Sequence, residues 1–198
     1  MRGFFITIYG INNIGKSTHA RLLVEGLKRR GYEAVYLKYP VYDLVPTGPE
    51  LNTILRSTAP QPLSEAQLQT LFARNRRDYE PTLVKMLDEG KIVVAEDYTG
   101  TGIAWGMAKG LDRQTLEKIN EGLLREDLPM LIVGERTLAA REKKHIHESD
   151  DALVEKVDHT LRELSKDKGW HIIELQKKLE ATAALIWTEV ENFIKTLR

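Results

Sequence analysis

The feature that most constrains the fold of this chain is the octapeptide at residues 10–17, with the sequence GINNIGKS. It matches G-x-x-x-x-G-K-[ST], in which glycines let the backbone turn so that its N–H groups surround phosphate oxygens. An apolar run precedes it at residues 4–9, and an amphipathic stretch follows over residues 16–30. A strand, a glycine-rich loop and a helix in this order predict a phosphate-binding loop. A chance strand-to-helix turn would have to explain four fixed positions and both flanking elements.

The residues of this loop have separate expected tasks. The helix that starts at Lys16 directs the partial positive charge of its N-terminus at the bound phosphate. We expect Lys16 to be catalytic by spanning the β- and γ-phosphates of ATP, and the Ser17 hydroxyl to bind Mg²⁺, which prefers oxygen ligands. The motif does not distinguish a kinase from a GTPase or a motor ATPase. The predicted nucleotide-binding residues are Gly10, Asn12, Asn13, Ile14, Gly15, Lys16, Ser17 and Thr18.

Four further apolar runs of strand length alternate with longer helical patterns. The runs lie at residues 34–37, 92–95, 130–133 and 171–173, and the helices are expected at residues 16–30, 64–88, 152–167 and 179–196. This alternation predicts an α/β P-loop fold with about five parallel strands, helices on both faces and a basic lid. Pro81 should bend or split the second helix. Residues 39–49 are expected to form a loop inside a single domain that covers residues 1–198.

Composition limits the partners of the chain. Its 198 residues include 29 basic and 29 acidic side chains, so no long-range field favours nucleic acid or an anionic membrane, and we expect neither as a partner. A small anionic ligand is the expected partner instead. The absence of cysteine excludes disulfides and thiolate chemistry and suits a cytoplasmic protein, which is the expected location. The run at residues 4–9 is too short for a signal peptide or a membrane span.

Beyond the phosphate-binding loop, four stretches resemble the thymidylate kinase family in their order and spacing. They are LKYP at 37–40, LFARNR at 71–76, VAEDY at 94–98 and TGIAWG at 101–106. The likeness covers about residues 4–133. The resemblance implies a homodimeric nucleoside-monophosphate kinase that uses ATP and Mg²⁺ to convert dTMP to dTDP.

The resemblance also implies roles for individual residues. Phe72 would stack on the acceptor base and Arg76 would hydrogen-bond to it, and their spacing places both on one helix face. Core packing is the alternative for Phe72, because Leu68 and Leu71 continue an apolar stripe. Trp105 replaces another aromatic residue of the family and is expected to pack in the core. The implied acceptor-site residues are Lys38, Tyr39, Pro40, Phe72, Arg76, Asp97, Tyr98, Thr101 and Gly102.

Glu96 follows the apolar run at residues 92–95, at the edge where open parallel sheets bind ligands. The family has an aspartate at this place that helps to position Mg²⁺. The resemblance therefore implies that Glu96 is catalytic and that Ser17 and Glu96 are the metal ligands.

The chain departs from the family at Asp97, where an arginine normally binds the acceptor phosphate. Two like unit charges about 4 Å apart repel by about 4 kcal/mol at an effective dielectric constant near 20. Asp97 therefore points elsewhere, binds a metal, or faces a different acceptor. Lys38 is the nearest basic substitute. Asn12 and Tyr9 also replace the acidic residues usual at their positions.

Positive charge for phosphoryl transfer is expected from the basic lid at residues 135–150. Among its cations Arg136, Arg141, Lys143 and Lys144, Arg141 is the first candidate for a catalytic role, against a solvated helix face as the alternative. His145 and His147 could suggest a metal, but two histidines in a charged loop more often have no such role.

Three functions remain open at this point. The first is phosphorylation of a nucleoside monophosphate, with dTMP as the expected acceptor. The second is a kinase for a nucleoside or another small acceptor, for which Glu96 or Asp97 would be a candidate general base. The third is a nucleotide-binding protein without catalytic activity.

Overall fold

The computed structural model of the protein describes residues 2–57, 60–135 and 151–197. Within these ranges one parallel sheet has the strand order β2-β3-β1-β4-β5. Its strands are β1 Phe5–Tyr9, β2 Ala34–Lys38, β3 Ile92–Glu96, β4 Leu128–Val133 and β5 His171–Glu174. The predicted five-stranded parallel sheet is confirmed, and each strand lies within two residues of its predicted range.

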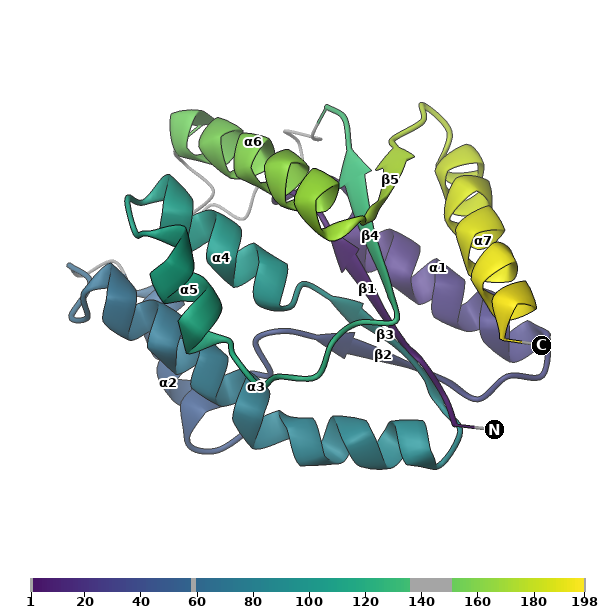
Figure 1. The fold of residues 1–198 in the computed structure, drawn as a ribbon, viewed down its shortest axis with the longest axis horizontal. Helices are drawn as coiled ribbons and strands as arrows, with labels where there is room; N and C mark the ends of the chain where they lie inside the picture. Colours follow the sequence, from purple (N-terminus) through teal and green to yellow (C-terminus); the bar gives the residue numbers. More distant parts are fainter. Residues whose placement is uncertain (1, 58–59, 136–150, 198) are drawn as a thin grey trace.

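Helices cover both faces of the sheet, as the alternating pattern predicts. Figure 1 shows α1 and α7 beside one face and α3, α4 and α6 beside the other. The helices of the described ranges are α1 Lys16–Arg29, α2 Thr47–Arg56, α3 Glu65–Asp88, α4 Thr99–Ala108, α5 Arg113–Ile119, α6 Asp151–Lys168 and α7 Leu179–Thr196. None of them combines the length and the hydrophobicity that a membrane span requires.

Burial explains why these segments form these elements. Strands β1 and β3 are buried along their whole length, which is why they are continuous apolar runs rather than alternating ones. Helix α1 buries Ala20, Leu23, Val24 and Leu27 on one face, at the spacing expected of an amphipathic helix.

The register of the sheet gathers the carboxyl ends of the strands at one edge. Glu96 of β3 lies beside Ile8 of β1 on one side and beside Lys38 of β2 on the other. Val133 of β4 lies beside Glu174 of β5. Residues that follow different strands along the chain therefore come together at this edge, where open α/β sheets bind ligands.

Two expectations about helices need correction. Pro81 lies inside α3 and does not split it, because the helix continues for 24 residues from a complete capping box at Ser64 and Gln67. Residues 39–49 are a loop only up to Pro46, since α2 begins at Thr47. Helices α4 and α5 are also present without a sequence prediction.

Candidate functional site

A cavity of about 640 Å³ lies at the carboxyl edge of the sheet, within the size range of small-ligand sites. The loop before α1, the end of β2, the face of α3, the start of α4 and the segment after β5 form its walls. The predicted site residues that line it are Asn12, Asn13, Ile14, Gly15, Lys16, Ser17, Thr18, Lys38, Tyr39, Pro40, Phe72, Arg76, Glu96, Asp97, Tyr98, Thr101 and Gly102.

Gly10 does not line the cavity but shapes the loop behind it. Its φ is 149°, and a Cβ there would lie 2.8 Å from Ile14 Cγ2 and 3.0 Å from the Ile132 carbonyl oxygen. Only glycine fits this turn. Asn13 adopts a left-handed φ of 65°, which asparagine tolerates better than most residues.

Lys16 is held inside the loop. Its Nζ donates hydrogen bonds to the carbonyl oxygens of Gly10 at 2.8 Å and Ile11 at 3.0 Å, and the residue is 6% exposed. The same atom lies 3.8 Å from Oδ1 of Asp97. The ammonium group is therefore fixed at the point where the loop meets the end of β3.

Glu96 is a buried carboxylate with polar partners on both oxygens. The Tyr36 hydroxyl donates to Oε2 at 2.5 Å, and Lys38 Nζ lies 3.1 Å from Oε1. Burial alone would raise the pKa of Glu96, but the charges of Lys38 and Lys16 outweigh it and hold that pKa below its usual value. The Ser17 hydroxyl contributes a further hydrogen bond in the same direction. An ionised carboxylate beside a hydroxyl is an oxygen donor set that suits Mg²⁺.

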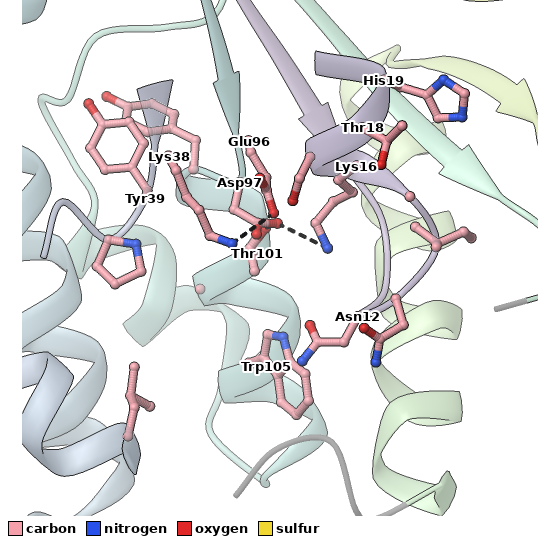
Figure 2. A pocket seen from close by; sticks show the side chains of 18 of the residues that line it. Asn12, Lys16, Thr18, His19, Lys38, Tyr39, Glu96, Asp97, Thr101 and Trp105 are labelled. Carbon is pink, nitrogen blue, oxygen red and sulfur yellow. Dashed lines mark hydrogen bonds and ion pairs between the residues drawn. The ribbon is translucent and has the colours of Figure 1, made fainter. Parts of the chain in front are cut away.

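Asp97 also lies in the cavity wall. Its φ of 61° is unusual for a residue with a side chain, and its Oδ1 accepts a hydrogen bond from Thr101 Oγ1 at 2.7 Å. Burial and the neighbouring charge of Glu96 raise the pKa of Asp97, although Lys16 opposes this. Figure 2 shows the carboxylates of Glu96 and Asp97 between the ammonium groups of Lys16 and Lys38. Each carboxylate is therefore paired with one lysine.

Helix α3 presents an aromatic ring and a guanidinium group to the cavity. Phe72 is partly buried, and Arg76 is 5% exposed with its Nη1 donating to Asn120 Oδ1 at 2.9 Å. Asn120 is itself held by a hydrogen bond to the Leu116 carbonyl oxygen. The structure thus brings together the two residues for which the resemblance implies contact with a base.

Three aromatic residues complete the acceptor side. The rings of Tyr39 and Tyr98 contact each other with centroids 5.0 Å apart, and both residues are almost fully buried. Trp105 is 9% exposed and belongs to the core, as expected, while it also lines the cavity. These rings form an aromatic part of the cavity wall.

Several lining residues escaped the sequence analysis. They are His19, Tyr42, Leu55, Arg56, Gln69, Leu175, Gln176, Lys177, Leu179 and Thr182. The residues after β5 could have been expected, because the carboxyl ends of all parallel strands meet at one edge. Gln69 precedes Phe72 by three residues on the same helix face, which was an available signal. No sequence signal pointed to Arg56, since α2 was not predicted.

The predicted lid residues Arg136, Arg141, Lys143, Lys144, His145 and His147 lie outside the described residues. The catalytic role of Arg141 therefore stays a prediction.

Comparison with known proteins gives one consistent family. A family profile described as thymidylate kinase matches residues 8–186. The human thymidylate kinase is 26% identical over 200 residues, which cover 98% of this chain and 93% of that protein. A solved structure of thymidylate kinase from Candida albicans has a TM-score of 0.78 and 24% identity over 96% of this chain and 92% of its own, which shows the same fold.

Two further relatives match a smaller part of this chain. A probable thymidylate kinase of Pyrococcus horikoshii is 32% identical over 140 residues, and one of Thermococcus onnurineus is 36% identical over 137 residues. These matches cover 67% and 65% of this chain, and the chain spans 65% of the length of each relative.

Proposed function

We propose, since this chain belongs to the thymidylate kinase family, that it transfers the γ-phosphoryl group of ATP to the phosphate of a pyrimidine nucleoside monophosphate, with dTMP as the preferred acceptor. The observation that carries the proposal is a single cavity that is lined by the phosphate-binding loop, Glu96, Phe72 and Arg76 together. Such a cavity can hold a triphosphate donor and a base-bearing acceptor with their phosphates adjacent.

The donor half consists of the loop at residues 10–17 and the start of α1. Its backbone N–H groups would bind the donor phosphates, and Lys16 would neutralise charge on the transferred group. Ser17 and Glu96 would hold Mg²⁺, which when bound supplies further neutralisation of the phosphate oxygens. Lys16 already lies beside both carboxylates, so its charge is directed at the junction of the two halves.

The acceptor half can bind an anion despite Asp97. The described residues lining the cavity carry two carboxylates, Glu96 and Asp97, and a larger set of cations, namely Lys16, Lys38, Arg56, Arg76 and Lys177. Lys38 and Arg56 are the cations that would contact the acceptor phosphate in place of the missing arginine. Lys38 ends β2 beside Glu96 of β3, Arg56 ends α2, and both line the cavity.

Phosphoryl transfer to a monophosphate requires mainly that the protein position the two substrates and neutralise their charge. A monophosphate acceptor already presents an anionic oxygen as the nucleophile, so no general base is needed. Aligning that oxygen with the γ-phosphorus and neutralising the equatorial oxygens are the main contributions of a protein to such a transfer. Arg141 completes the proposal as the first candidate among the lid cations. The family resemblance adds a homodimer packed through helices, and the lack of cysteine suits a cytoplasmic location.

A coupled assay of ADP release tests the proposal. The acceptors are dTMP, dUMP, dCMP, thymidine and none, and Lys16→Ala serves as the inactive variant with Lys28→Ala, on the exposed side of α1, as its matched control. We expect the highest turnover with dTMP, none with thymidine, and a loss of at least about 100-fold in Lys16→Ala. Turnover of thymidine alone would favour a nucleoside kinase, and ATP binding without turnover of any acceptor would favour a non-catalytic protein.

A further inference from the structure

Gln69 is a buried polar side chain of the acceptor half to which neither the sequence nor the proposed function gives a role. It is 3% exposed and lines the cavity. It lies three residues before Phe72 and seven before Arg76, so α3 presents all three side chains on one face. A buried amide in a ligand cavity needs partners for both its donor and its acceptor atoms.

Its neighbours determine which way the amide faces. Gln69 Nε2 donates a hydrogen bond to Glu65 Oε1 at 2.8 Å, and Lys109 Nζ donates to the other oxygen of the same carboxylate at 2.8 Å. An ionised carboxylate only accepts hydrogen bonds, so the NH₂ group of Gln69 must face Glu65. The carbonyl oxygen Oε1 is therefore turned the other way.

Oε1 lies close to the backbone of α4 at Gly102. A Cβ at Gly102 would lie 3.1 Å from Gln69 Oε1 and 2.8 Å from Arg76 Nη2. The absence of a side chain at Gly102 thus lets an acceptor atom and a donor atom lie together against the backbone of α4. Asn120 holds the guanidinium of Arg76 from behind through Nη1, which fixes the donor as Glu65 fixes the acceptor.

We propose that Gln69 is a specificity-determining residue that accepts a hydrogen bond from the ring N–H of a uracil-type base. This role rests on the proposed function. Uracil and thymine present a carbonyl oxygen next to a ring N–H, which complements a donating guanidinium next to an accepting amide oxygen. Cytosine presents an amino group next to an unprotonated ring nitrogen, so it would place donor against donor and acceptor against acceptor. Buried mismatches of this kind are how polar sites reject analogues.

The experiment compares kcat/KM for dTMP, dCMP and 3-methyl-dTMP, which lacks the ring N–H. For the wild type we expect dTMP to exceed both other acceptors by at least about tenfold. In Gln69→Leu the dTMP advantage over both should fall by about tenfold, mainly through KM for dTMP. Thr70→Ala, an exposed change at the next position of α3, is the matched control and should leave the ratios unchanged.

Glu65→Ala tests the orientation of the amide. Glu65 is a positioning residue in this account, because it acts on the base only through Gln69. Its loss frees the amide to present NH₂, so the dTMP to dCMP ratio should fall while kcat for dTMP stays within about threefold of the wild type. A purely structural role would lower both acceptors equally and leave the ratio constant.

Three results would overturn the inference. One is equal turnover of 3-methyl-dTMP and dTMP by the wild type, which needs no variant to fold. Another is an unchanged dTMP to dCMP ratio in folded Gln69→Leu while dTMP is still turned over, which would refute this role and leave the proposed function standing. Failure of the wild type to phosphorylate any monophosphate would refute the proposed function and this role with it.

Discussion

Lys38 Nζ lies 3.1 Å from Oε1 of Glu96, and this ion pair joins the carboxyl ends of β2 and β3 at the base of the cavity. The side chain of Lys38 is 47% exposed, whereas that of Glu96 is 5% exposed. The ammonium group therefore reaches from a buried carboxylate toward the cavity, where an acceptor phosphate would compete for it.

Replacement of Lys38 by Met should raise the KM for dTMP. The change removes a cation that the acceptor phosphate would contact, and charge-assisted hydrogen bonds of this kind contribute about 1.5–3 kcal/mol, so we expect an increase of about 10- to 100-fold. The KM for ATP should change less. Steady-state kinetics with each substrate varied in turn measures both values.

Lys91→Met is the control for this prediction, since Lys91 pairs with Glu89 at the opposite edge of the sheet. It should leave both KM values unchanged. An increase in the KM for ATP with a constant KM for dTMP would place Lys38 on the donor side instead.

Phe72→Leu separates base stacking from core packing. If the ring stacks on the acceptor base, its loss should raise the KM for dTMP about fivefold to tenfold while the melting temperature changes little. Leu71→Ala at the neighbouring, more deeply buried position should do the reverse, with a loss of about 2–5 kcal/mol in the free energy of unfolding. The KM for dTMP and the thermal denaturation of both variants distinguish base stacking from core packing. Equal destabilisation by both changes, with KM constant, would assign Phe72 to the core.

Glu126→Gln should change how stability depends on pH. Glu126 accepts a hydrogen bond from the buried Tyr9 hydroxyl, and burial raises the pKa of Glu126 above its usual 4.5. A raised folded-state pKa gives stability that is present below the unfolded-state pKa and is lost as pH rises through the folded-state value. The wild type should therefore lose stability relative to Glu126→Gln between about pH 4 and neutrality.

Melting temperatures measured from pH 4 to pH 8 check this prediction. Glutamine keeps an oxygen that can accept from Tyr9, so the comparison isolates the ionisation of Glu126. Glu121→Gln, an exposed change nearby, should follow the wild type at every pH. Parallel curves of melting temperature against pH for Glu126→Gln and the wild type would show that ionisation of Glu126 does not destabilise the fold.

The sequence predicts the strands and the phosphate-binding loop well because their signals are local. Continuous apolar runs indicate strands buried on both faces, and the loop motif fixes its own backbone turn at Gly10. Glu96 and Asp97 could be placed at the site because they directly follow such a run. Their pairing with Lys38 and Lys16 could not, since it depends on the register between strands and on the fold of the loop.

Helix α4 shows why the rest was not predictable. Gly100, Gly102 and Gly106 lower its helix propensity, so its sequence does not resemble a helix. The structure stabilises it through close packing, since Gly100 lies against Trp170 and Gly106 against Leu116. Trp170 lies 70 residues away along the chain, and no local pattern reveals that contact.

The final prediction concerns two glycines of α4, at which alanine should have different consequences: Gly100→Ala should lower stability, and Gly102→Ala should raise the KM for dTMP. At Gly100 a Cβ would lie 2.3 Å from Cη2 of Trp170, whose ring is buried and stacked on Tyr9 with centroids 4.3 Å apart. That ring cannot move aside cheaply, so Gly100→Ala should cost about 1–3 kcal/mol of stability.

At Gly102 a Cβ would meet only the ends of two flexible side chains, Arg76 and Gln69. Moving those ends strains the hydrogen bonds to Asn120 and Glu65 but displaces no core ring. Gly102→Ala should therefore lower the melting temperature less than Gly100→Ala does. The shift would displace the atoms that face the acceptor base, and the KM for dTMP should rise about tenfold. Thermal denaturation and steady-state kinetics of the two variants check the contrast. A folded Gly102→Ala variant with an unchanged KM would mean that the acceptor base does not contact Arg76 and Gln69 beside this glycine.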